Sequence, residues 1–505
     1  MSPNPVRRVV ILGGGTAGWM TAAAISKTLG DACDVHVVES DAIGIIGVGE
    51  ATIPHIKHFN RGLELDEDEF LRRTQGTFKL GIEFVNWGRL GDRFIHGFGA
   101  VGHELDSVPF HHFWLRRWQA GQAKPLAAYS INTVAPQFAK FMRMQPKMAG
   151  SPLADLAYAF HFDASLYAGF LREFAQRHGA RRTEGKVVRV LQREPDGFIS
   201  GLQMESGEQI DGDFFIDCSG IRALLIEQAL HAGYENWQHW LRCDTAIAVP
   251  CESVAPLVPM TRSTAHGAGW QWRIPLQHRT GNGHVFSSRY MGEDEATAIL
   301  LGNLDGAPLA EPRTIKYVTG RRRSFWVKNC VAVGLSSGFL EPLESTSIHL
   351  IQSAIARILQ FFPQAGFDAA DVAEYNAITQ TEYERIRDFL ILHYHATERS
   401  DSAFWNDCRT MDIPATLRQR MDLFRSNGRI VRDTADLFAE LSWLQVLQGQ
   451  RVHARGHHPL ADLRSDAEVD EFLGNVQGVI RKCVDLMPSQ AEFIAANCAA
   501  QRGSA

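Results

Sequence analysis

Apolar residues of the β-branched type run from Val9 to Leu12 and stop at a glycine-rich turn, after which alanines follow at helical density. This order predicts a buried strand, a tight turn and a helix beginning near Ala17. A second apolar strand is predicted over residues 34–39, and it ends in an acid, Glu39. Strand, turn, helix and strand in this order predict the first part of an α/β fold with a parallel sheet.

Later apolar runs predict how the chain returns to this sheet. Strands are expected over residues 185–191, 214–220 and 330–335, while alternating segments at 270–274 and 284–288 predict an antiparallel sheet. Residues 157–163 lead into a helical pattern over 166–174. Residues 100–150 show no clear periodicity and are expected to form an excursion from the sheet. The run Arg321–Arg323 is interpreted as a solvated turn.

From Ser345 onward the hydrophobic spacing becomes mostly helical, as in residues 351–362 and 386–393. Such stripes are more typical of a packed core than of a cofactor site. We expect two interwoven parts: a nucleotide-binding core with inserted segments and an antiparallel sheet over residues 1–350, and a mainly helical covering region over residues 351–505. Neither an internal repeat nor a low-complexity linker separates them.

The composition narrows the functional classes. The 505 residues are 45% hydrophobic and 21% charged, with a net charge of −6 and no long run of one sign, which argues against a nucleic-acid or anionic-membrane surface. No apolar run reaches the length of a membrane span, and the N-terminal apolar run is interpreted as a strand, not a signal peptide. Eight cysteines without C-x-x-C spacing indicate neither a disulfide framework nor a metal site, and reduced thiols favour a cytoplasmic protein.

The glycine turn carries the first candidate chemistry. Gly13, Gly15 and Gly18 have the G-x-G-x-x-G spacing, which permits a tight turn, close approach of a pyrophosphate and close packing of helix on strand. Glu39 stands where an acid binds the ribose hydroxyls of a dinucleotide; the alternative interpretations are an accidental turn and a solvated strand end. Residues 43–52 contain three further glycines, which suit a loop lying against a flat ligand. A single fingerprint favours tightly held FAD over a diffusing nicotinamide.

Several separate motifs resemble those of one enzyme family. The chain is similar along nearly its whole length to the flavin-dependent halogenases of the tryptophan-halogenase type. The resemblance lies in the glycine turn 13–18, Gly47–Thr52, Lys79, the segment Gly269-Trp-Gln-Trp-Arg-Ile-Pro275 and the segment Phe339-Leu-Glu-Pro-Leu-Glu-Ser-Thr346. The W-x-W-x-I-P signature is the most specific of these.

This resemblance implies a fold like that of the FAD-dependent aromatic hydroxylases. It also implies a reaction in which reduced FAD and oxygen form a hydroperoxide, which a bound halide attacks to give hypohalous acid. Trp270 and Trp272 are expected to form a barrier that keeps the organic substrate away from the flavin. Since the chain has no second nucleotide fingerprint, a separate flavin reductase is expected to supply reduced FAD. An aromatic hydroxylase and a nucleotide-binding protein without redox turnover remain the alternatives.

Two side chains are expected to be catalytic by this resemblance. Lys79 is placed between flavin and substrate, where its ammonium could hydrogen-bond hypohalous acid or carry the halogen as a haloamine. Without the resemblance, it would be interpreted as a surface lysine. Glu344 is expected to polarise the oxidant and to accept the proton lost by the aromatic ring. Its alternative role is to stabilise the start of a helix.

The sequence also predicts which residues bind the halide and FAD. Thr346 and Ser347 precede an apolar helix, so unpaired backbone N–H groups at its positive end favour a bound halide, chloride or bromide. The family usually has glycine where this chain has Ser347, which leaves the halide preference open. FAD contacts are expected at Gly13, Gly15, Thr16, Ala17, Gly18, Glu39, Ala51, Val187, Leu335 and Ile348.

The substrate prediction rests on a difference from the family. His96 and Phe98 match a His-x-Phe pair that sandwiches an indole, although an ordinary strand segment explains them equally well. Relatives acting on free tryptophan also have paired tyrosines in a C-terminal segment, whereas residues 436–449 here contain none and only Glu440 and Trp443 resemble that segment. A zwitterion needs polar partners in place of its lost hydration. The sequence therefore favours indole or an indole derivative over free tryptophan, with a carrier-bound or larger aromatic as the alternative.

Overall fold

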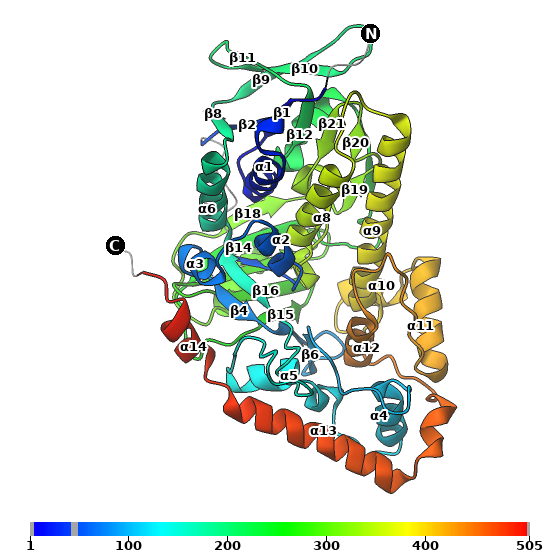
Figure 1. Cartoon of the computed structure of the whole chain (residues 1–505). Coiled ribbons are helices and arrows are strands. Elements are labelled where there is room, and N and C mark those ends of the chain that lie inside the picture. The colour runs from blue at the N-terminus through cyan, green and yellow to red at the C-terminus, as the bar shows by residue number, and fades with distance from the viewer. Residues whose placement is uncertain (1–4, 42–48, 502–505) are drawn as a thin grey trace.

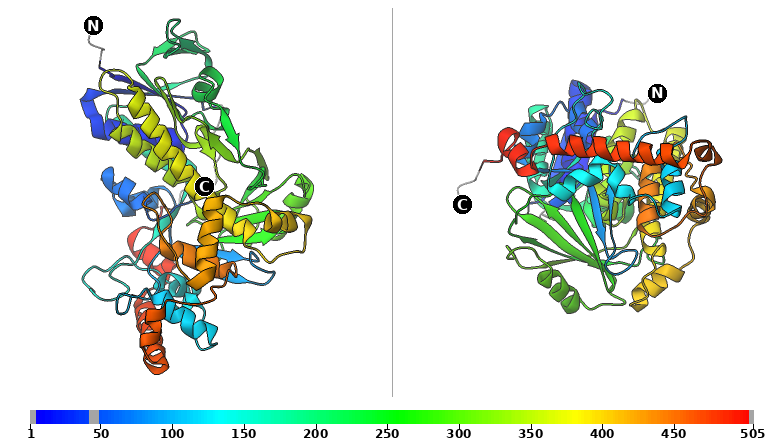
Figure 2. Two further views of the ribbon diagram at one scale, coloured as in Figure 1. Left: turned by 90° about the vertical axis from the view of Figure 1, so that its right-hand side faces the viewer. Right: turned by 90° about the horizontal axis from the view of Figure 1, so that it is seen from below.

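The computed structural model describes residues 5–41 and 49–501 of the chain. Residues 43–48 of the predicted glycine loop lie outside the described residues. The molecule is elongated, with a parallel sheet at one end, a large antiparallel sheet in the middle and a helical layer at the other end (Figures 1 and 2). The fold is α/β with a mainly helical C-terminal region, as predicted.

The parallel sheet is built around the first strand, β1. Its order within the described chain is β20 (Trp326–Val327), β21 (Cys330–Ala332), β12 (Phe214–Asp217), β1 (Arg8–Leu12), β2 (Asp34–Glu39) and β8 (Arg181–Glu184). All neighbours pair in parallel except β20 and β21. The strands predicted near residues 9–12, 34–39, 214–220 and 330–335 are thereby confirmed, whereas the strand predicted over residues 185–191 forms outside this sheet.

Two glycines allow the close packing at the end of β1. Gly13 has a φ of +119°, and a Cβ there would lie 2.2 Å from the Cys218 carbonyl oxygen. A Cβ on Gly18 would lie 1.8 Å from the Gly13 carbonyl oxygen. Any larger residue would collide with rigid backbone, so helix α1 (Thr16–Leu29) reaches its position only with glycine at both sites. Helix α1 packs between α6 (Ala164–Arg177) and α8 (Ser347–Gln360).

The antiparallel sheet lies below the parallel one in Figure 1 and confirms the alternating segments of the sequence. Its strand order in the described chain is β18 (Arg313–Lys316), β14 (Thr245–Cys251), β17 (Thr280–Phe286), β16 (Gly269–Pro275), β15 (Thr261–His266), β5 (Gly81–Val85) and β6 (Arg93–Gly97). One neighbouring pair, β15 and β5, is parallel. Helix α7 (Glu293–Gly302) packs on β17.

Three smaller sheets complete the strands of the described chain. Their strands are β3 (Gly49–Ala51), β7 (Ala159–Asp163) and β4 (Thr77–Lys79); β13 (Tyr234–Asn236), β19 (Gly320–Arg322) and β22 (Gly338–Phe339); and β11 (Gln209–Asp211), β10 (Ile199–Met204) and β9 (Val187–Gln192). The last of these sheets, β11-β10-β9, lies at the outer end beside the parallel sheet (Figure 1). The sequence did not predict β7, because it is buried on both faces and lacks alternation. Its last residue, Asp163, caps α6 by accepting hydrogen bonds from the N–H groups of Ser165 and Leu166.

The prediction of a solvated turn at residues 321–323 is wrong for the first two arginines, whereas Arg323 is exposed beyond the end of the strand. Arg321 and Arg322 lie in β19 and are buried. Arg321 pairs with Glu384, and Arg322 pairs with Glu227 and donates to the Ser336 carbonyl oxygen. A run of arginines is buried when distant parts of the chain supply acidic partners, and no local pattern reveals those partners.

Helices dominate the chain from Ser345 onward, as predicted: α9 (Ala369–His395), α10 (Ala403–Thr410), α11 (Ala415–Asn427), α12 (Glu440–Gly449), α13 (Asp466–Leu486) and α14 (Gln490–Asn497) follow α8. The sequence did not predict four earlier helices, α2 (Ile56–Gly62), α3 (Glu67–Arg73), α4 (Phe110–Gln119) and α5 (Ile131–Val134). Helix α13 packs on α4 and α5, so segments before residue 350 help to build the helical end of the molecule (Figure 2). The division at residue 350 stays a prediction.

Membrane-spanning helices and metal sites can be sought only among residues 5–41 and 49–501, which the structure describes. None of the helices there combines the length and apolarity that a membrane crossing needs. The same residues contain no cluster of three or more metal-ligating side chains.

Candidate functional site

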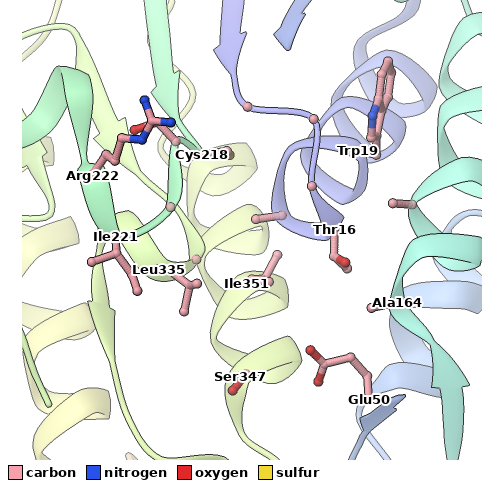
Figure 3. A pocket seen from close by; sticks show the side chains of 18 of the residues that line it. Thr16, Trp19, Glu50, Ala164, Cys218, Ile221, Arg222, Leu335, Ser347 and Ile351 are labelled. Atoms are coloured by element: carbon pink, nitrogen blue, oxygen red, sulfur yellow. The ribbon is translucent and has the colours of Figure 1, made fainter. Parts of the chain in front are cut away.

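A cavity of about 1060 Å³ opens beside the glycine turn and extends to the start of α8 (Figure 3). Most of the predicted FAD-contact residues line it: Gly13, Gly15, Thr16, Ala17, Glu39, Ala51, Val187, Leu335 and Ile348. Gly18 is not part of the lining, because it faces the backbone of Gly13. The cavity thus joins the end of β1, the end of β2 and the first turns of two helices in one elongated space.

The glycine-turn end of the cavity suits a dinucleotide. A Cβ on Gly15 would meet no atom of the described chain within 4 Å, so the space in front of this residue is open to a ligand. Glu39 receives a hydrogen bond from the Trp19 indole N–H at 3.2 Å and pairs with Arg182. A Cβ on Gly14 would overlap the Glu39 carboxylate. Gly14 therefore leaves the room that the Glu39 side chain occupies, and the G-x-G-x-x-G spacing does not predict this requirement.

The opposite end of the cavity is lined by Trp272, Ser345 and Ser347. Glu50 also lines it, and its side chain points into the space in Figure 3. Burial raises the pKa of this carboxyl to about 7. The sequence analysis included Glu50 only as part of a motif, not as a site residue.

Lys79 ends the short strand β4 and is completely buried. Its Nζ donates a hydrogen bond to the Ser345 hydroxyl oxygen at 2.7 Å and lies 5.1 Å from the centre of the Phe98 ring. Burial lowers the pKa of Lys79 to about 7, against the opposing attraction of Glu344. The amine is therefore poised between its charged and neutral forms near neutral pH.

Glu344 is held between two histidines. It lies in the 3₁₀ turn η7 (Pro342–Glu344), and its Oε2 is 2.9 Å from His96 Nδ1. His393 Nε2, from α9, lies 2.8 Å from Glu344 Oε1. Burial alone raises the pKa of a carboxyl, but His96 and His393 outweigh it and lower the pKa of Glu344 to about 2. Glu344 is consequently ionised at neutral pH although water cannot reach it.

Aromatic rings extend from this carboxylate into the helical end of the molecule. The His96 ring lies 5.9 Å from Phe389, and Phe389 stacks on Phe438 at 3.9 Å. Trp443 meets Phe389 edge-on at 4.9 Å. The predicted substrate residues His96 and Trp443 therefore belong to one aromatic cluster, joined through α9, while Phe98 lies beside Lys79. The Trp443 indole nitrogen is buried without a hydrogen-bond partner in the described chain.

The two predicted barrier tryptophans lie on the same face of β16. Trp272 lines the cavity, and its ring covers Gly283 on β17, where a Cβ would lie only 2.1 Å from the ring. Trp270 does not line the cavity; its indole N–H donates to Glu341 Oε2 at 3.0 Å. The barrier strand is thus in direct contact with the segment that carries Glu344.

The predicted halide residues stand at the start of α8. Thr346 is the N-cap of this helix, and its hydroxyl oxygen is buried with no hydrogen-bond partner among residues 5–41 and 49–501. Ser347 lines the cavity. The preceding Ser345 has a φ of +58°, so the chain turns sharply between Glu344 and the helix. Unpaired donors at a helix N-terminus favour a small anion here.

Sequence reasoning missed three side chains that surround Glu344. They are His393 and Phe389 in α9, and Phe438. The apolar spacing of this region predicts a packed core, and the two phenylalanines are indeed buried in the core. The only available signal was a histidine, His393, at a helical position otherwise occupied by apolar residues. A buried histidine of that kind is usually structural, so the pattern alone did not identify it.

Comparisons with known proteins agree with this geometry. The family model for tryptophan halogenases matches residues 8–466. The tryptophan 6-halogenase SttH of Streptomyces toxytricini is 33% identical, over 97% of this chain and 98% of its own. The solved structure of Xcc4156, a flavin-dependent halogenase from Xanthomonas campestris, is 48% identical with a TM-score of 0.95 and covers 99% of both chains. That of BrvH, a flavin-dependent halogenase from Brevundimonas sp. BAL3, is 44% identical with a TM-score of 0.93, over 97% of this chain and 99% of its own.

Proposed function

This chain belongs to the tryptophan halogenase family of flavin-dependent enzymes, and on that premise we propose that it transfers an electrophilic halogen to an electron-rich aromatic ring. Its cofactor is FAD, reduced by a separate flavin reductase, and its other reactants are molecular oxygen and a halide. Bound reduced FAD supplies the oxygen activation by which halide becomes hypohalous acid. The side chains described above bind, orient and deprotonate the other reactants.

The observation that carries this proposal is the position of Ser345. This residue lines the large cavity, and its hydroxyl accepts a hydrogen bond from Lys79 Nζ at 2.7 Å. This contact supports a route by which hypohalous acid formed in the cavity passes to the Lys79 amine and not through bulk water. There the ammonium form can donate a hydrogen bond to the oxidant, and the neutral amine can carry the halogen.

The halide is proposed to bind at the start of α8. The backbone donors at Thr346 and Ser347 supply an electropositive site, and the unpartnered Thr346 hydroxyl offers a further donor. Because Ser347 also lines the cavity, an anion held there lies next to the space proposed for FAD. This adjacency supports a halide site next to the position where the halide is to be oxidised.

Glu344 is proposed to accept the proton that the ring loses after halogen transfer. Its carboxylate is ionised and held by His96 and His393 on its two oxygens. The two histidine rings fix the direction of the carboxylate, so that it stays in one position for the proton transfer. His393 thereby acts as a positioning residue for Glu344.

The substrate is proposed to be indole or an indole derivative rather than free tryptophan. The side chains packed around Phe389 are aromatic, and the charges near them are already paired. Arg420 lies over the Trp443 ring at 4.7 Å and pairs with Asp436 at 2.6 Å. A zwitterion would have to break such pairs to replace its hydration, whereas a bare ring would not.

Product formation under defined conditions tests the proposal. The protein is supplied with chemically reduced FAD, oxygen and indole, with and without bromide, and the products are identified by mass. We expect a brominated product that requires bromide, and its near-complete loss in Glu344→Gln while FAD binding persists. An oxygenated product formed equally without halide would instead show an aromatic hydroxylase and overturn the proposal.

Two further features belong to the same proposal. Because the reductase is separate, the purified protein should consume NADH only after a flavin reductase is added. A cytoplasmic location is also proposed, and it is compatible with cysteines that are all unpaired in the structure.

A further inference from the structure

Glu341 lies three residues before Glu344 and is completely buried. Its Oε2 accepts hydrogen bonds from two side chains on different elements: the Trp270 indole on β16 and the Tyr394 hydroxyl on α9. Its Oε1 has no hydrogen-bond partner in the described part of the chain. One carboxyl oxygen therefore joins the barrier strand, the longest helix and the segment that carries Glu344.

The surroundings of Glu341 are aromatic. Trp87 lies 6.4 Å from Trp270, 5.4 Å from Tyr394 and 5.7 Å from Trp405. Burial among these rings raises the pKa of Glu341 to about 7, against the opposing effect of its two hydrogen bonds. Burying a carboxyl costs free energy, so an apolar residue would be the simpler way to fill such a space. The hydrogen bonds to Trp270 and Tyr394 are what a carboxyl adds.

The geometry assigns Glu341 a role in the barrier between the cavity and the substrate side. Trp270 and Trp272 are neighbours on one face of β16, with ring centres 6.2 Å apart, and Trp272 lines the cavity. Trp270 is fixed by Glu341, and the same turn continues into Glu344 and Ser345. The barrier strand is therefore bonded directly to the segment that contains Glu344 and Ser345.

We propose that Glu341 is a positioning residue that clamps Trp270 against the Glu344 turn, so that the oxidised halogen passes to Lys79 and not into solvent. This inference rests on the proposed halogenase function. When the clamp is removed, Trp270 loses its partner and the barrier loosens. The consequence is leakage of hypohalous acid, and fewer halogenated molecules form per reduced FAD consumed.

The test compares variants that keep or remove the acceptor oxygen. Glu341→Gln retains an oxygen that can accept from Trp270 and Tyr394, whereas Glu341→Leu does not. We expect Glu341→Leu to lower the halogenated product per reduced FAD at least fivefold and to raise the hypohalous acid captured by a taurine trap in solution. Glu341→Gln should restore most of the coupling, which a merely space-filling role would not predict.

Trp270→Phe tests the same contact from the other side, and it serves if Glu341→Leu does not fold. It should produce the same leakage. The matched control is Trp405→Phe, which also removes a buried indole donor, but one that bonds the His266 carbonyl oxygen at 2.7 Å and not Glu341. This control should keep normal coupling.

The outcomes separate the two proposals. If the native protein forms no halide-dependent product, the proposed function itself fails. If the native protein halogenates and both Glu341→Leu and Trp270→Phe retain its ratio of product to reduced FAD, the role of Glu341 is overturned. Equal leakage in Trp405→Phe would also overturn it, because the effect would then belong to the aromatic packing and not to the clamp.

Discussion

Lys79 shows how a single buried charge links the proposed chemistry to stability. In the unfolded chain a lysine has a pKa near 10.5, whereas burial lowers the pKa of Lys79 to about 7 in the folded protein. Between these values the unfolded state binds one more proton than the native state. The free energy of unfolding therefore rises with pH over this window, by up to about 1.4 kcal/mol per pH unit from this group.

We expect Lys79→Met to abolish halogenated product while leaving FAD bound. The variant should also be more stable than the native protein near pH 7, with an advantage that shrinks toward pH 10, because the methionine has no proton to lose on folding. Urea unfolding at pH 7.5 and 9.5 measures this difference. The control is Lys482→Met, which replaces an exposed lysine on α13. A Lys79→Met advantage that does not change with pH would contradict the explanation.

At the scale of one element, the start of α8 is a proposed anion site whose side chains differ from the family pattern. The backbone donors of the proposed site are present whichever residue follows Thr346, but Ser347 also lines the cavity with its side chain. A hydroxyl there adds a donor and also occupies space. Both effects favour chloride, since it is smaller than bromide and accepts stronger hydrogen bonds.

Ser347→Gly should therefore shift the product toward bromination. One lost hydrogen bond of about 1 kcal/mol corresponds to an approximately fivefold change in the ratio of brominated to chlorinated product. The ratio is measured by mass with both salts present at equal concentration. Ser347→Thr keeps the hydroxyl and serves as the control. An unchanged ratio in Ser347→Gly would show that this side chain does not contact the halide.

At the scale of the whole molecule, the proposed substrate side is assembled from widely separated segments. Helix α12 carries Trp443 and packs on β6, which carries His96, while α9 contributes Phe389 and His393 between them. The relatives with higher identity, Xcc4156 and BrvH, are described as flavin-dependent halogenases without a named substrate. SttH, at 33% identity, is described as a tryptophan halogenase.

We expect kcat/KM for indole to exceed that for free tryptophan by at least about tenfold, since an unpaired polar group costs one or more kcal/mol when buried. Initial rates with both substrates measure this. A control with 5-methylindole adds bulk without charge and should react at a rate close to that of indole. A clear preference for tryptophan would mean that residues 436–449 bind the amino-acid group after all.

The sequence by itself determined the elements whose causes are local. The apolar run at Val9–Leu12, the glycine spacing after it and the alternation around Trp270 each specify the structure of a few neighbouring residues, and the structure confirms those elements. The motifs around Lys79 and Glu344 were also recognisable in the sequence, although only because they resemble those of a known family. Their roles stay predictions.

The tertiary structure alone decided what those motifs contact. Lys79 meets Ser345 across 266 positions of the chain, and His96 meets Glu344 across 248. Likewise, the sequence predicted His393 to be one residue of a core helix and Arg321 to be part of a solvated turn. In the folded chain each of them lies beside a carboxylate from a distant segment. Hydrophobic periodicity records which face of an element is buried, but not which distant side chain is buried against it, and burial beside a particular partner is what sets the charge and the chemistry of these residues.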